Sequence, residues 1–175
     1  MMKFINGTLK DKLILSADDL HVIKWCVDSS FAVHPDFKSH TRACMTCGTG
    51  MPKTKLQKQK LNTRSSTEAK LVGADDVSGP ILWTKHFMEA QGYEIKKNIL
   101  YQDNKSTILL LENGKKSSSK RTRAINIRYF FLTDQIEKGN LSVEYCPTTE
   151  MIGDFFTKPL QGRLFEKHRK QIMGH

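Results

Sequence analysis

The chain has 175 residues, 38% of them hydrophobic and 26% charged, a balance that suits one globular domain and excludes a disordered or fibrous protein. No apolar run approaches the roughly 20 residues that cross a bilayer, so we do not expect an integral membrane protein. The N-terminus lacks the apolar stretch of a secretory signal, and nothing implies export. Lys and Arg number 28 against 18 Asp and Glu, a net charge of +10, and a domain this basic most often binds nucleic acid.

The first half of the chain predicts a stub, three strands and a long helix. Residues 1–20 form a helical-looking stub without a core of its own. Residues 21–27 are rich in β-branched and aromatic side chains and predict a buried strand. Two further strands of a meander are predicted over residues 42–46 and 54–59. Ser65 to Glu68 matches a capping box, and the helix that it begins runs to Gly92.

The second half alternates strands with helices. It predicts, in chain order, a strand over residues 98–102, helices over 104–113 and 121–138, a strand over 141–145, a short helix around residue 154, and a basic helix within 161–175. This order of elements predicts a mixed α/β sheet.

Acidic residues lie at or near the ends of the predicted strands. Asp28 follows the first strand, Asp103 follows the fourth, and Asp154 follows the last after a short loop, while Glu68 lies in the first turn of the long helix. If the first and fourth strands are neighbours, Asp28 and Asp103 lie side by side. Converging carboxylates favour hard divalent cations such as Mg²⁺ or Mn²⁺. The alternative is structural: Glu68 only caps its helix, and Asp103 caps the helix that follows it.

Several short motifs occur in a characteristic order. They are Val27-Asp28-Ser29-Ser30-Phe31, Ser65-Ser66-Thr67-Glu68-Ala69, Gln102-Asp103-Asn104-Lys105-Ser106, Arg121-Thr122-Arg123, Ile127-Arg128-Tyr129 and Asp154-Phe155-Phe156-Thr157-Lys158-Pro159-Leu160. Over about residues 20–165 the chain closely resembles the ribonuclease H domain of copia-type (Pseudoviridae) retrotransposon polyproteins.

The resemblance implies a fold, an activity and a set of site residues. The fold is ribonuclease H-like α/β, a mixed five-stranded sheet with helices on both faces. The activity is metal-dependent endonucleolytic hydrolysis of the RNA strand of RNA–DNA hybrids during reverse transcription. Catalysis would use two Mg²⁺ ions, or Mn²⁺, bound by Asp28, Glu68, Asp103 and Asp154.

This chain departs from the family pattern near those residues. Many relatives read Ser-Ser-Thr-Glu-Ala-Glu where this chain has Lys70, which we interpret as a harmless surface change. Ala124 replaces a common histidine, and residues 147–153 lack the histidine that cellular ribonucleases H carry before the last acid. We expect slow product release or metal exchange from these losses.

Two other clusters of residues suggest ligands. A basic run predicts phosphate contacts, and Asn104 and Ser106 are further candidates for binding nucleic acid; the run comprises Lys115, Lys116, Lys120, Arg121 and Arg123. His34, His40, Cys44 and Cys47 have the ligand types of a zinc site. We favour ordinary β-structure there and expect no zinc, and no disulfide framework either.

The predicted organisation is a connector from an upstream reverse transcriptase over residues 1–20, a ribonuclease H-like domain over 21–160 and a basic helix over 161–175. The expected partners are an RNA–DNA hybrid and the reverse transcriptase of the same polyprotein, without a membrane. The expected location is the cytoplasm, in the virus-like particle of a retrotransposon, or the nucleus. The alternative function is a catalytically silent domain of a degenerate copy that binds nucleic acid or serves as a spacer.

Overall fold

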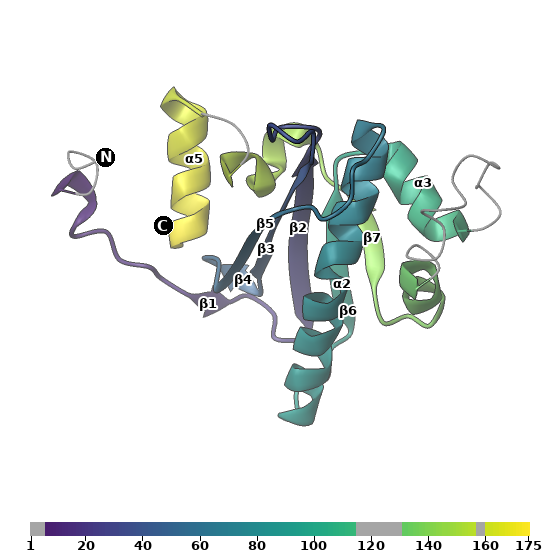
Figure 1. Cartoon of the computed structure of the whole chain (residues 1–175). Helices are drawn as coiled ribbons and strands as arrows, with labels where there is room; N and C mark the ends of the chain where they lie inside the picture. Colours follow the sequence, from purple (N-terminus) through teal and green to yellow (C-terminus); the bar gives the residue numbers. More distant parts are fainter. Residues whose placement is uncertain (1–5, 115–130, 157–159) are drawn as a thin grey trace.

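A mixed five-stranded sheet forms the centre of the molecule (Figure 1). The computed structural model describes residues 6–114, 131–156 and 160–175, except the side chain of Asp154. The strands are β2 (Val22–Ser30), β3 (His40–Thr46), β5 (Lys53–Lys58), β6 (Lys97–Gln102) and β7 (Ser142–Tyr145), in the order β5-β3-β2-β6-β7. β3 is antiparallel to both β2 and β5, whereas β6 is parallel to both β2 and β7. The predicted mixed sheet is therefore confirmed.

Helices cover both faces of this sheet, as predicted. The alternation along β2 places Ile23, Trp25 and Val27 on the face that packs against α2 (Ser66–Ala90), α3 (Lys105–Asn113) and the helical residues 131–137. Cys26 lies on the other face, against η4 (Ile152–Phe156) and the C-terminal helix α5 (Gly162–Met173). The short helix η3 (Thr148–Glu150) joins β7 to η4. None of the described helices is long and apolar enough to cross a membrane.

The N-terminal segment differs from its prediction. Within the described residues 6–20, residues 6–8 are helical, and β1 (Ser16–Ala17) pairs antiparallel with β4 (Gly48–Thr49). The N–H of Ile14 donates to the carbonyl of Met173 at 2.8 Å. A short isolated helix is marginal in water, whereas β4 and α5 satisfy this backbone directly.

Helix α2 lies very close to the sheet at Gly73. A methyl group at this position would overlap the hydroxyl of Ser29 in β2. Gln59 supports the same contact, because its amide Nε2 donates to Thr41 Oγ1 at 2.9 Å and to the carbonyl of Ala69 at 2.8 Å. The start of α2 is therefore held firmly against the end of β2.

We expect Gly73→Ala to destabilise the domain by about 1–3 kcal/mol, because the added methyl group must push α2 away from Ser29. Gly79→Ala is the matched control: it lies in the same helix, and a methyl group there has no atom within 4 Å. The control should change stability by less than about 0.5 kcal/mol. Thermal melts of both variants test the contact, and equal melting temperatures would contradict it.

Candidate active site

Asp28 and Asp103 lie next to each other at one end of the sheet. The parallel register pairs Cys26 with Tyr101, and Asp28 and Asp103 each lie two residues further along the chain, so both stand at the same end of the two strands. Both carboxylates are nearly buried: 7% of the Asp28 side chain and 10% of the Asp103 side chain is exposed. The sequence predicted that Asp28 and Asp103 lie side by side if the first and fourth strands are neighbours. The strand order places these strands, β2 and β6, next to each other.

The ammonium group of Lys70 lies between these two carboxylates. Its Nζ donates to Oδ1 of Asp28 at 2.9 Å and to Oδ1 of Asp103. Burial lowers the pKa of Lys70, but the charges and hydrogen bonds of Asp28 and Asp103 outweigh this effect and raise the pKa above the ordinary lysine value. Lys70 is therefore a charged partner of both acids at neutral pH.

The interpretation of Lys70 as a harmless surface change was wrong. Only 13% of its side chain is exposed, and the side chain points to the pair of acids. The helical spacing carried a signal for this: Ala74, Val77 and Ile81 continue from Lys70 at steps of four, three and four residues, and all three are buried. Lys70 thus lies at the N-terminal end of the stripe that faces the core.

The structure does not bring Glu68 to this pair. Ser65 Oγ accepts the N–H of Glu68 at 3.2 Å, and Glu68 Oε2 accepts the N–H of Arg64 at 2.7 Å. Residues two apart on a helix point about 200° apart, so the helix that directs Lys70 to the acids directs Glu68 away from them. These contacts agree with the structural alternative, in which Glu68 only caps its helix.

Asp154 lies in η4, and the backbone of η4 passes close to Asp28. A Cβ at the preceding residue, Gly153, would lie 3.0 Å from the Cβ of Asp28, which places η4 directly against that acid. The role predicted for the Asp154 side chain stays a prediction. The helix-capping role considered for Asp103 belongs instead to Asn104, whose side chain accepts the N–H of Thr107 at 3.1 Å.

The predicted nucleic-acid contacts lie partly at the same end of the sheet. Asn104 and Ser106 stand at the start of α3, directly after Asp103. Beside them, Lys105 Nζ lies 5.1 Å from the ring centroid of Tyr145, the last residue of β7, whose side chain is exposed. The sequence analysis did not single out Tyr145. The basic run of Lys115, Lys116, Lys120, Arg121 and Arg123 lies outside the described residues.

The candidate zinc ligands occupy separate places. His34 Nε2 and His40 Nδ1 are 3.0 Å apart, but the thiol of Cys44 is buried against the Cys26 carbonyl on the sheet. Cys47 follows β3, at the end of the sheet away from Asp28. Among the residues that the structure describes, no three His, Cys, Asp or Glu side chains form a group that could hold a metal.

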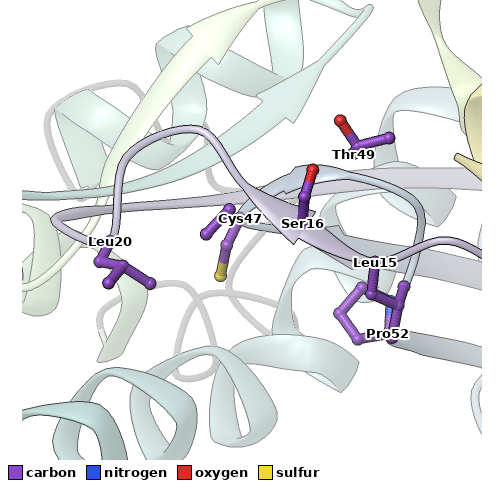
Figure 2. A pocket seen from close by; sticks show the side chains of 7 residues that line it. Leu15, Ser16, Leu20, Cys47, Thr49 and Pro52 are labelled. Atoms are coloured by element: carbon purple, nitrogen blue, oxygen red, sulfur yellow. The ribbon is translucent and has the colours of Figure 1, made fainter.

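Cys47 instead lines an apolar pocket of about 230 Å³ under the N-terminal segment (Figure 2). The other lining residues are Leu15, Ser16, Ala17, Leu20, Thr49 and Pro52, none of them charged. Burial raises the pKa of the Cys47 thiol above its ordinary value. A thiol that stays protonated is a poor nucleophile.

The described donor set at the acid pair does not fit the two Mg²⁺ ions that the resemblance implies. Two nearly buried carboxylates face one ammonium group, which cannot donate an electron pair to a metal while it is protonated. The carboxylates of Asp28 and Asp103 each accept a hydrogen bond from that ammonium group through Oδ1. A divalent cation placed between them would meet a like charge at contact distance.

Comparison with known proteins gives relatives of one kind. No family model matches the chain. It is 27% identical, over its whole length, to the retrovirus-related Pol polyprotein from transposon TNT 1-94 of Nicotiana tabacum, of which it spans 13%. It is 30% identical over 117 residues to the corresponding polyprotein from transposon RE1 of Arabidopsis thaliana, covering 66% of the chain and 8% of the relative.

Among solved structures, LC11-RNase H1, isolated from compost by a metagenomic approach, superposes with a TM-score of 0.52 at 9% identity. The match covers 73% of this chain and 86% of that one, and at this identity it shows the fold alone. The relatives are Pol polyproteins of plant transposons and the structural neighbours have the ribonuclease H fold, so both comparisons agree with the predicted resemblance to the ribonuclease H domain of a copia-type polyprotein.

Proposed function

We propose that this chain recognises RNA–DNA hybrids as the ribonuclease H-type domain of a retrotransposon Pol polyprotein, and that it binds the hybrid without cutting it. The fold and the homology support a role of ribonuclease H type in general. LC11-RNase H1, which shares the fold, has been solved in complex with an RNA/DNA hybrid. The net charge of +10 supports binding to a polyanion.

One observation favours binding over hydrolysis: the ammonium of Lys70 is hydrogen-bonded to both Asp28 and Asp103. The resemblance predicts metal-dependent hydrolysis, which requires carboxylates that are free to bind Mg²⁺ or Mn²⁺. With Lys70 in place, these two acids are already neutralised in part by the protein itself. The catalytically silent alternative is therefore the function that the geometry supports best.

The surface beside the acid pair supports hybrid binding. Tyr145 presents an exposed ring at the end of β7, and Lys105 holds a cation next to it. An aromatic ring can stack on a base or a ribose, while a lysine can neutralise a phosphate. Ser106 offers a hydroxyl from the same helix turn, and hydroxyl groups suit contacts with the 2′-OH that distinguishes RNA from DNA.

The wider context is proposed on the same basis. The relatives are polyproteins of which this chain spans a small part, so we propose that the reverse transcriptase of the same polyprotein is its neighbour. The site of action would be the virus-like particle in the cytoplasm, where reverse transcription makes hybrids.

The wild-type protein should shift a labelled RNA–DNA hybrid in a mobility assay and leave it uncut in Mg²⁺ or Mn²⁺. Affinity should fall steeply with salt, because lysine and arginine side chains displace counterions from phosphates. Double-stranded DNA and double-stranded RNA of the same sequence serve as competitors. Metal-dependent cutting of the hybrid by the wild-type protein would overturn the proposal that the domain is catalytically silent. Equal affinity for all three duplexes would overturn the proposal that it recognises hybrids.

Neutralising the basic run should weaken this binding and its dependence on salt. Replacing Lys115, Lys116, Lys120, Arg121 and Arg123 with Gln should make the slope of log affinity against log salt shallower by up to about 4. The slope is measured by fluorescence anisotropy with a labelled hybrid. An unchanged slope would show that the run makes no phosphate contacts.

Tyr145→Ala should lower hybrid affinity about tenfold, since a stacking contact is typically worth about 1–3 kcal/mol. Tyr93→Ala is the matched control: this tyrosine is also exposed, but it follows the far end of α2. The same anisotropy assay compares the two variants. Equal losses would show that the contact is not specific to the end of the sheet that carries the acids.

A further inference from the structure

We propose that Lys70 is a built-in cation that takes the place of a metal ion between Asp28 and Asp103, and that a single substitution, Lys70→Glu, converts the site into one that binds a divalent cation. The inference deepens the proposed function, on which its biological meaning rests. It assigns the silence of the domain to one side chain rather than to a general decay of the fold.

The first step is that the acid pair needs a cation to be stable. Asp28 is nearly buried in β2, and Asp103 stands at the same end of the neighbouring strand β6. Two carboxylates held together away from water repel each other and lose hydration, so they persist when a positive charge joins them. Lys70 supplies that charge with a hydrogen bond to each acid.

The second step is that contacts other than those of Lys70 position the backbone around the acid pair. The pairing of β2 with β6, up to Cys26 and Tyr101, brings Asp28 and Asp103 to the same end of the sheet, and the Lys70 side chain takes no part in it. Gly153 packs η4 against Asp28, and Gly73 holds α2 close to Ser29. None of these contacts involves the Lys70 side chain, so a change at this position alters the charge of the site and leaves its framework in place.

The third step is that position 70 points to the space that a cation would fill. Its side chain reaches both acids from the first turns of α2. A glutamate there is shorter than lysine, so its carboxylate would face Asp28 and Asp103 across a gap. Three carboxylates around such a gap are hard oxygen ligands of the kind that Mg²⁺ and Mn²⁺ prefer.

The test measures metal binding by the free protein, so it can fail or succeed independently of hybrid binding. Titration of Mn²⁺ followed by electron paramagnetic resonance counts bound ions in wild type, Lys70→Glu and Lys97→Glu. Lys97 is the matched control, because it is exposed at the opposite end of β6 and its reversal changes the net charge equally. Lys70→Gln is measured as well: it removes the positive charge without adding a third acid.

Lys70→Glu should bind Mn²⁺ at least about tenfold more tightly than wild type, whereas Lys97→Glu should match wild type. Mn²⁺ should also raise the melting temperature of Lys70→Glu selectively. If Lys70→Glu does not fold without metal, Lys70→Gln decides: tighter Mn²⁺ binding than wild type supports the proposal. Equal Mn²⁺ affinity in wild type and the folded Lys70 variants would overturn it, as would equal gains in Lys70→Glu and Lys97→Glu.

Asp103→Asn tests the built-in cation in the wild-type background. If the two acids were an unoccupied metal site, removing one charge would relieve repulsion and preserve or raise metal-free stability. With Lys70 between them, the same change removes half of its ionic partners, so the melting temperature in EDTA should fall by about 3 °C or more. In Lys70→Glu the sign should reverse, and Asp103→Asn should raise the metal-free melting temperature. An Asp103→Asn variant as stable as wild type would contradict the proposal.

Discussion

A single ammonium group shared by two carboxylates is the interaction on which the candidate site depends. Asp28 lies within a buried strand, and Asp103 directly follows the neighbouring strand. Their adjacency is imposed by the register of β2 and β6, which the packed core on both faces of the sheet holds in place. A positive charge offsets the mutual repulsion and lost hydration of such a pair, and Lys70 provides that charge from α2. The polypeptide itself therefore supplies a cation that neutralises this pair in part.

This arrangement separates two properties that a ribonuclease H-type domain normally combines. Hybrid recognition depends on surface cations, exposed rings and hydroxyls, and the end of the sheet retains such groups in Lys105, Tyr145 and Ser106. Hydrolysis depends on carboxylates that can take up metal ions, and here Lys70 competes for the same oxygens. Under the proposed function, a basic domain whose acid pair is partly neutralised by Lys70 stays attached to a hybrid without cutting the RNA strand.

The fold tolerates lysine at this position because the surrounding contacts are made by other residues. Ser65 and Glu68 cap the start of α2, so the charge of residue 70 does not decide whether the helix begins there. Gly73 and Gln59 hold the helix against the sheet. Lysine is also a good helix former, and its long side chain reaches both acids from the edge of the core stripe. The proposed replacement of a metal ion by Lys70 is therefore compatible with an intact fold.

The amino-acid sequence by itself determined the five strands of the central sheet, the main helices and the family resemblance, because alternation, capping residues and short motifs are local properties. It also determined that Asp28 and Asp103 each lie at the end of a predicted strand, although their meeting depended on a strand order that spacing does not specify. Only the tertiary structure decided between Glu68 and Lys70. Both lie in the first turns of the same helix, and which of them faces the acids depends on how α2 is rotated against the sheet. That rotation is set by the packing of Ala74, Val77 and Ile81 into the core, a long-range constraint that the capping motif around Glu68 does not contain.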